Sequence, residues 1–129
     1  MIKLIATDMD GTLLDEKGNL PEGFFDIFHK LKENGIKFVV ASGRPYYTLY
    51  ENFKPISDEL YYICDNGSCI AEENKKPKVD VMDKKQIEEI VKLCEDIPNT
   101  TLILCGVKGA YHKPCDDSFL NEINKYYIK

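Results

Sequence analysis

The sequence lacks any long apolar run and any excess of basic residues. No stretch reaches the length of a membrane span or of a signal-peptide core, which predicts a cytoplasmic protein with no membrane partner. The formal net charge is -5, and a nucleic-acid binder needs a basic face. The acidic balance therefore argues against nucleic acid as a partner. It leaves room for a small phosphorylated ligand, which needs only local positive charge.

Patterns typical of disulfides and zinc sites are also missing. The five cysteines are odd in number and include no Cys-x-x-Cys pair, so neither a disulfide framework nor a zinc site is expected. We expect reduced, mostly buried thiols. The two histidines lie far apart, without neighbouring ligand residues. We place His29 at the solvent edge of a helix and leave His112 without a role.

The first half of the chain alternates strand and helix patterns. Three apolar segments predict buried strands: 2–7, 36–41 and 60–64. Apolar residues at helical spacing predict a helix between the first two: Phe24, Ile27, Phe28 and Leu31. Pro45 suits the start of a second helix over residues 46–53. Strands separated by helices of this length predict the α/β class, with a partial Rossmann-like core of parallel strands over 1–65.

The pattern changes after residue 65. Residues 69–72 and 78–82 predict a β-hairpin, and Asp83 with Gln86 resembles a capping box that opens a helix. Two more strands, 101–105 and 110–113, and a helix from about Asp116 complete the order. The apolar side of this last helix is predicted to comprise Phe119, Leu120, Ile123, Tyr126 and Tyr127. This order predicts a partial α+β segment over 66–129.

Two aspartates follow the first predicted strand directly, in Asp8-Met9-Asp10-Gly11-Thr12. Ligands of open α/β sheets bind at the carboxyl ends of strands. Paired carboxylates there can hold Mg²⁺, and one can attack phosphorus while the other protonates the leaving alcohol and then activates water. Two aspartates beside a glycine are also common in plain turns and loose cation sites. The pair alone leaves both interpretations open.

A second polar loop, Ser42-Gly43-Arg44, ends the next predicted strand. A hydroxyl, free backbone N–H groups and a guanidinium can together hold phosphate oxygens. An ordinary strand-to-helix turn capped by Ser42 would explain this loop equally well by itself. Polar loops at two neighbouring strand ends favour a phosphoryl-transfer site over a coincidence.

Three segments together resemble the haloacid dehalogenase superfamily, and more narrowly its Cof-type phosphatases, whose α+β cap follows the third core strand. They are Asp8-Met9-Asp10-Gly11-Thr12-Leu13-Leu14, Ala41-Ser42-Gly43-Arg44-Pro45 and Asp65-Asn66-Gly67-Ser68. The resemblance implies a Mg²⁺-dependent hydrolase of small phosphorylated metabolites such as sugar phosphates. It makes Asp8 the nucleophile and a metal ligand, and Asp10 the general acid/base and a metal ligand through its carbonyl. It assigns phosphate or substrate contacts to Gly11, Thr12, Ser42, Gly43, Arg44 and Asn66.

The sequence departs from that family in its later motifs. A lysine and a second acidic metal-binding pair find no match, so the resemblance covers an amino-terminal portion with weak or no activity by itself. Absent neighbouring strands would leave the first strand as an exposed apolar edge, where a second copy could pair. Two alternatives stay open: a phosphomutase on the same scaffold, and a non-catalytic phosphate- or metal-binding fragment that assembles with another chain.

Overall fold

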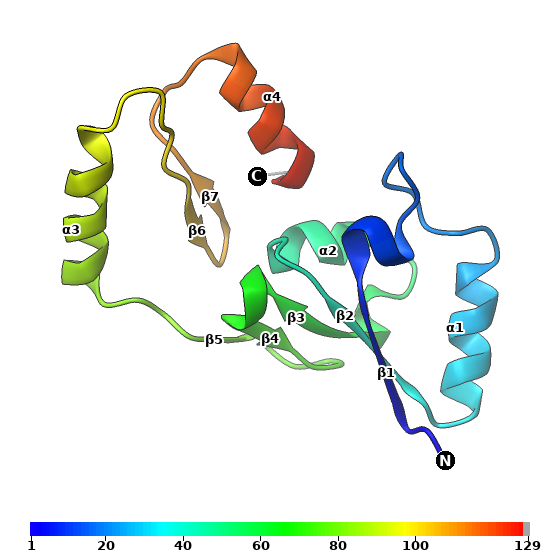
Figure 1. Cartoon of the computed structure of the whole chain (residues 1–129). Helices are drawn as coiled ribbons and strands as arrows, with labels where there is room; N and C mark the ends of the chain where they lie inside the picture. The colour runs from blue at the N-terminus through cyan, green and yellow to red at the C-terminus, as the bar shows by residue number, and fades with distance from the viewer. Residues whose placement is uncertain (128–129) are drawn as a thin grey trace.

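A five-stranded mixed sheet forms the first region of the molecule (Figure 1). The computed structural model describes residues 1–127. The strands, in sheet order, are β1 (Leu4–Asp8), β2 (Lys37–Ala41), β3 (Tyr61–Cys64), β4 (Cys69–Ala71) and β5 (Lys78–Val79). Strands β1, β2 and β3 are parallel, whereas β4 and β5 are antiparallel. The parallel strands and their connecting helices confirm the α/β class. We call residues 4–79 the sheet region.

Helices α1 (Phe24–Glu33) and α2 (Tyr46–Asn52) pack their apolar side chains with those of the strands in one continuous core. Phe24 meets Phe38 edge-on at 5.5 Å between ring centroids and lies 5.7 Å from Phe53. One expectation for α1 is wrong, because Ile27 is 58% exposed. The neighbouring Phe25 packs against the core in its place, so the buried stripe of α1 is rotated from the predicted one.

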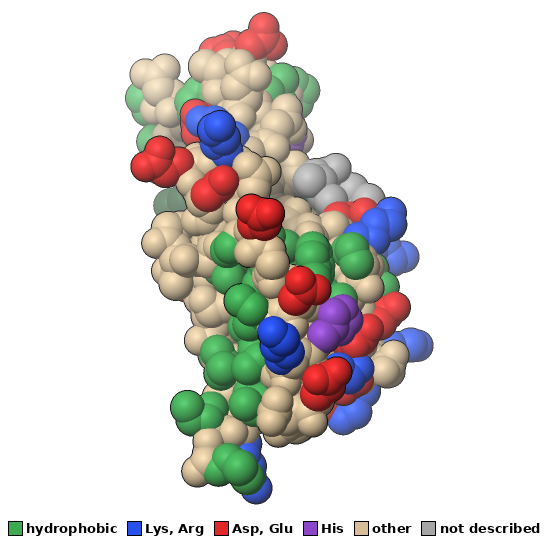
Figure 2. All heavy atoms as spheres, turned by 90° about the vertical axis from the view of Figure 1, so that its right-hand side faces the viewer, with side chains coloured by type: hydrophobic (Ala, Val, Ile, Leu, Met, Phe, Trp, Pro, Cys, Tyr) green, Lys and Arg blue, Asp and Glu red, His purple; other side chains and the backbone are tan. Residues whose placement is uncertain are grey.

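The edge and one face of the sheet stay open. Strand β1 pairs only with β2 in the described sheet. It is therefore an edge strand, as expected from the absence of further neighbouring strands in the sequence pattern. Hydrophobic side chains gather along this side of the molecule (Figure 2). Leu4 of β1 is 53% exposed, and Ile63 of β3 and Ile70 of β4 are also exposed. Parallel sheets are usually covered on both faces, so an exposed apolar surface of this kind is unusual for one.

The hairpin predicted after residue 65 joins the same sheet instead of starting a separate one. Cys64 of β3 lies opposite Cys69 of β4, and Ile70 pairs in turn with Lys78 of β5. Strand pairing therefore continues across the predicted division at 65/66. That division stays a prediction.

A second region, which we call the distal region, comprises residues 84–127. It contains α3 (Lys84–Glu95), the hairpin of β6 (Leu104–Gly106) and β7 (Gly109–Tyr111), and α4 (Asp117–Tyr126). Asp83 is confirmed as the N-cap of α3, since its carboxylate accepts the Lys85 N–H at 2.8 Å, while the part of Gln86 in the predicted capping box stays a prediction. The hairpin turns at Val107-Lys108, and its strands are shorter than predicted because residues 101–103 and 112–113, at its outer ends, do not pair. Helix α4 and the hairpin lie over the end of the sheet that carries α2 (Figure 1).

The cysteines divide between the two regions. All five are free, in line with the expected absence of a disulfide framework. Cys64 and Cys69 are buried in the sheet region, but Cys105 is exposed, and the other two are only half-buried. The expectation of mostly buried thiols is therefore wrong for the distal region, where packing is thin. His29 is exposed on α1, as predicted. Across residues 1–127, no helix is both long and apolar enough to cross a bilayer.

Candidate active site

The ends of three strands bring the predicted site residues together. In the parallel register Asp8 lies beside Ala41, and Ala41 lies beside Ile63. The loops that follow β1, β2 and β3 therefore emerge at one edge of the sheet. These loops carry all the residues to which the sequence assigns catalytic or phosphate contacts.

The loop after β1 is anchored by Met9, which is completely buried. Residues on either side of a buried position project outward, and both Asp8 and Asp10 are exposed. The Leu14 N–H closes the loop on the Met9 carbonyl at 2.9 Å. Gly11 has φ +77°, a left-handed conformation that glycine adopts without steric cost. The sequence therefore builds a short, tight turn that presents two carboxylates to solvent.

Ser42 lies deeper than the carboxylates, at 8% exposure. Its N–H donates to the Ile63 carbonyl at 2.9 Å, and its Oγ accepts the Arg44 N–H at 3.1 Å. The hydroxyl proton is thereby left to donate elsewhere, for example to a phosphate oxygen. Side-chain position and hydrogen-bonding capacity both suit the role predicted for Ser42.

The loop after β3 closes against the loop after β2. The Asp65 N–H donates to the Arg44 carbonyl at 3.1 Å, and the Asn66 N–H donates to the Ser42 carbonyl at 3.4 Å. A Cβ on Gly43 would lie 3.0 Å from Asn66 Oδ1, so glycine is what allows this close approach. Asp65 and Asn66 have φ of +48° and +56°. Such strained non-glycine residues cluster at functional sites.

Partial burial distinguishes Asp65 from the other acids of this edge. Desolvation raises the pKa of the Asp65 carboxyl above its usual value. Asp65 has no predicted role of its own. A turn-like Asp-Asn-Gly segment gives no sign of how deeply its first residue is buried.

Arg44 binds Asp10 through two hydrogen bonds. Its Nε donates to Asp10 Oδ2 at 3.0 Å, and its Nη2 donates to Asp10 Oδ1 at 2.6 Å. The side chain of Arg44 is 14% exposed, against 49% for Asp10. Bidentate arginine–carboxylate pairs fix both position and plane. The structure thus places Arg44 on the predicted acid/base, while its contact with phosphate stays a prediction.

The donor set suits a metal held in part by its substrate. Mg²⁺ is usually bound by one or two carboxylates together with phosphate oxygens and water. Both carboxylate oxygens of Asp10 accept hydrogen bonds from Arg44, so the Asp8 carboxylate and the Asp10 backbone carbonyl would meet that requirement. No cluster of three or more His, Cys, Asp or Glu side chains exists among residues 1–127 to form an all-protein cage. Two lysines of the distal region are engaged in ion pairs: Lys113 with Glu95 and Lys125 with Glu122.

A cavity lies elsewhere, between α3 and the β6–β7 hairpin. It has a volume of about 470 Å³, and its walls include Val91, Leu104 and Tyr111. None of the predicted site residues lines it. The three loops carry the convergent polar groups, so the candidate site lies with them and not at this cavity.

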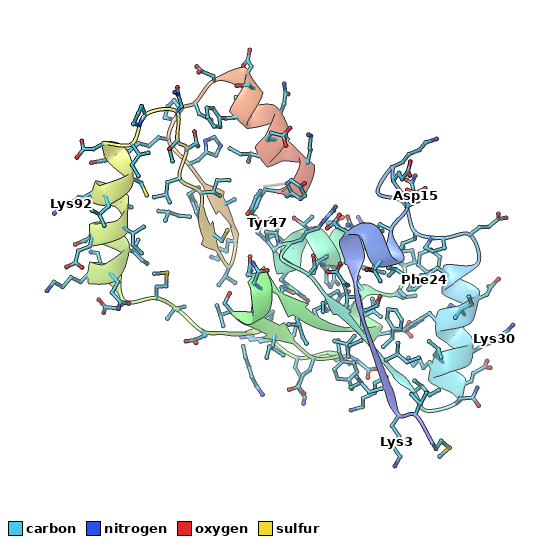
Figure 3. The ribbon with its side chains drawn as sticks, viewed as in Figure 1. Lys3, Asp15, Phe24, Lys30, Tyr47 and Lys92 are labelled. Atoms are coloured by element: carbon cyan, nitrogen blue, oxygen red, sulfur yellow. The ribbon has the colours of Figure 1, made fainter. Side chains whose placement is uncertain are left out.

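Aromatic residues of both regions meet above the site. The Tyr126 ring of α4 lies 5.7 Å from the Arg44 guanidinium carbon. Tyr47 of α2 faces the distal region (Figure 3). Burial raises the pKa of Tyr127 to about 12, and its hydroxyl lies 3.7 Å from Cys105 Sγ. Sequence reasoning assigned Tyr126 and Tyr127 to an apolar helix side, and no local signal could reveal that they meet another region.

Comparison with known proteins identifies the family of these loops. A family model described as haloacid dehalogenase-like hydrolase matches residues 5–129. The 5-amino-6-(5-phospho-D-ribitylamino)uracil phosphatase YbjI of Escherichia coli K12 is 37% identical over 98% of this chain and 47% of its own length. The phosphoglycolate phosphatase of Sulfolobus acidocaldarius is 33% identical over 97% of this chain and 53% of its own length.

Solved structures agree with this family. The crystal structure of SMU.1108c from Streptococcus mutans has a TM-score of 0.89 and 32% identity, covering 99% of this chain and 49% of that one. The chain spans about half the length of the curated relatives it matches. The family resemblance read from the three sequence segments is confirmed.

Proposed function

Because this chain belongs to the haloacid dehalogenase-like hydrolases, we propose that it carries the nucleophile half of a Mg²⁺-dependent phosphomonoesterase. The observation that supports this most directly is the position of Asp8 and Asp10, at a strand end beside the buried Ser42. Nucleophile, acid/base and a phosphate-oxygen donor then share one edge of the sheet.

The proposed reaction has two displacements at phosphorus. The Asp8 carboxylate attacks the phosphate ester, forming an aspartyl phosphate as the ester oxygen leaves with a proton from Asp10. Asp10 then takes a proton from water, which attacks the phosphorus, releases inorganic phosphate and restores Asp8. Ser42, the Gly43 N–H, Gly11 and Thr12 bind phosphate oxygens, and Asn66 borders the substrate.

Mg²⁺ completes the proposed site. The Asp8 carboxylate and the Asp10 backbone carbonyl would hold it, and when bound it offsets negative charge on the phosphate and on the nucleophile. Arg44 is already bonded to Asp10, so the described residues place little other positive charge near Asp8. We therefore expect residues 1–129 to turn substrate over only weakly, since electrostatic stabilisation is usually a leading catalytic contribution.

The substrate we propose is a small phosphorylated metabolite, a sugar or sugar-alcohol phosphate. The E. coli relative is named for a ribityl phosphate ester, and its alignment with this chain, at 37% identity, covers 98% of the chain. We propose a cytoplasmic location, where such metabolites occur.

Trapping the covalent intermediate tests this proposal without requiring turnover. The purified chain is incubated with acetyl phosphate and Mg²⁺, and its intact mass is measured before and after hydroxylamine treatment. We expect one hydroxylamine-labile phosphoryl group on the unmodified chain and none on Asp8→Asn. The matched variant Asp10→Asn should keep the label and lose it roughly 100-fold more slowly, because general-base help is gone. A label that survives in Asp8→Asn contradicts the assigned nucleophile, and no label on the unmodified chain favours the non-catalytic alternative.

We also propose that the open edge of β1 is a site of pairing with a second copy of this chain. Its apolar residues and unpaired backbone groups favour strand addition. Light scattering across a concentration series should show dimers that Leu4→Lys weakens at least tenfold. A monomer at all concentrations contradicts this proposal.

A further inference from the structure

The Arg44 guanidinium is held from two sides by residues of different regions. Asp10, on the loop after β1, accepts two of its hydrogen bonds, and Tyr126, at the end of α4, offers its ring at 5.7 Å. Arg44 itself comes from the loop after β2. Three segments far apart in sequence therefore converge on one cation.

The alignment of Asp10 depends on what holds Arg44. A half-exposed carboxylate on a turn can rotate freely, whereas a two-point pair with a guanidinium fixes its plane. The guanidinium sits on a flexible stem and needs a further contact to be fixed itself. An aromatic face supplies one, and arginine stacks on such faces more readily than lysine does.

Packing alone does not account for Tyr126. Its side chain is 45% exposed, whereas Ile123, one turn earlier on α4, is 8% exposed and anchors the helix. A residue that contributes mainly to burial would occupy the position of Ile123. The specific contribution of Tyr126 at its position is therefore its contact with Arg44.

We propose that Tyr126 is a positioning residue for Asp10, acting through Arg44. The inference rests on the proposed acid/base role of Asp10. It means that the distal region supports the chemistry itself and does not merely border the substrate. Removing the ring keeps the hydrogen bonds between Arg44 and Asp10 but leaves the pair more mobile.

The direct test measures Arg44 in the chain as it is. In ¹⁵N-labelled protein, exchange of the Arg44 Nε–H with water reports its hydrogen bond to Asp10. We expect Tyr126→Leu to speed this exchange about two- to fivefold, the range that a cation–π contact supports. Tyr126→Phe keeps the ring and should match the unmodified chain. Equal exchange in Tyr126→Leu and the unmodified chain overturns the proposal.

A matched control removes a similar contact far from the site. Tyr61 lies under Lys37 Nζ at 4.8 Å, on the strands of the same sheet. Tyr61→Leu should leave Arg44 Nε–H exchange unchanged, and circular dichroism checks that each variant is folded. Faster exchange in Tyr61→Leu as well would mean a general loosening and would contradict a specific role for Tyr126.

A second readout depends on the leaving group. The nitrophenolate of a nitrophenyl phosphate can leave without being protonated, whereas the alkoxide of an alkyl phosphate needs a proton from the general acid as it leaves. Asp10 also activates water in the second displacement, which both esters share, so the readout is kcat/KM, which reports the first displacement alone. Tyr126→Leu should lower kcat/KM for the alkyl ester two- to fivefold and leave kcat/KM for the nitrophenyl ester unchanged. Equal losses on both esters overturn the positioning role. If acetyl phosphate puts no label on Asp8, the proposed function fails, while the exchange measurement still decides the contact between Tyr126 and Arg44.

Discussion

The sheet region and the distal region contain similar element types but bury their side chains very differently. Every member of the buried core cluster lies between Met9 and Ala71. In the distal region, no residue of α3 is buried, and Ile123 is the only buried apolar side chain among the described residues 84–127. Both regions have amphipathic helices, so the difference does not arise from sequence pattern.

This contrast shows what helical periodicity can and cannot establish. An apolar stripe predicts that a helix has a face to bury, but the stability of the helix depends on what packs there. On α1 that partner is present in Phe38 and its neighbours. On α3 the apolar side chains Ile87, Val91 and Cys94 are only partly covered. The loops that carry the predicted site residues extend from the well-packed region, whereas Tyr126 approaches them from the thinly packed one.

The largest test of this contrast compares one core residue with one surface residue. Phe53 is completely buried, so Phe53→Ala should lower the free energy of unfolding by about 3–5 kcal/mol through lost burial and a new cavity. Leu93, on α3, is 71% exposed, and Leu93→Ala should change it by no more than about 0.5 kcal/mol. Urea titration followed by near-ultraviolet circular dichroism of the tyrosines measures both. Comparable losses in the two variants would mean that the distal region is packed as tightly as the sheet.

Sequence patterns predicted the elements of both regions better than their packing. The three parallel strands, both crossover helices and the cap at Asp83 were all predictable, because periodicity, turn residues and capping are local signals. The prediction for Ile27 is wrong because the buried stripe of α1 is rotated toward Phe25, and spacing alone does not fix which side of an apolar stripe meets the sheet. The addition of the β4–β5 hairpin to the core sheet could not be predicted, because a hairpin pattern does not show which strand lies next to it in a sheet.

The candidate site shows the same limit. Asp8, Asp10, Ser42 and Gly43 follow strand ends, and a parallel sheet must bring such ends together. The pairing of Arg44 with Asp10 could not be read from the sequence, because side-chain partners depend on three-dimensional distances. The approach of Tyr126 is harder still, since it depends on how the last helix lies over the sheet.

A pH titration sharpens the contrast through the cysteines. Burial raises the pKa of the Cys64 thiol far above its usual value, and burial also raises the pKa of Cys69. The unfolded thiol ionises near pH 9, while the folded one stays neutral, so the stabilisation is full below pH 9 and is lost as the pH rises further. For Cys64 alone the loss at pH 10 is about 1.4 kcal/mol.

Comparing one variant from each region isolates this contribution. Cys64→Ala should flatten the fall in unfolding free energy between pH 8 and pH 10, whatever it does to stability at neutral pH. Ile123→Ala removes the buried apolar side chain of the distal region, which carries no titratable group, and should leave the slope unchanged. A slope that changes as much in Ile123→Ala as in Cys64→Ala would contradict the assignment of the pH dependence to the buried thiol. The slope is a sharper criterion than stability at a single pH, because it detects only groups whose ionisation differs between folded and unfolded chains, and burial by the sheet region is what creates that difference at Cys64.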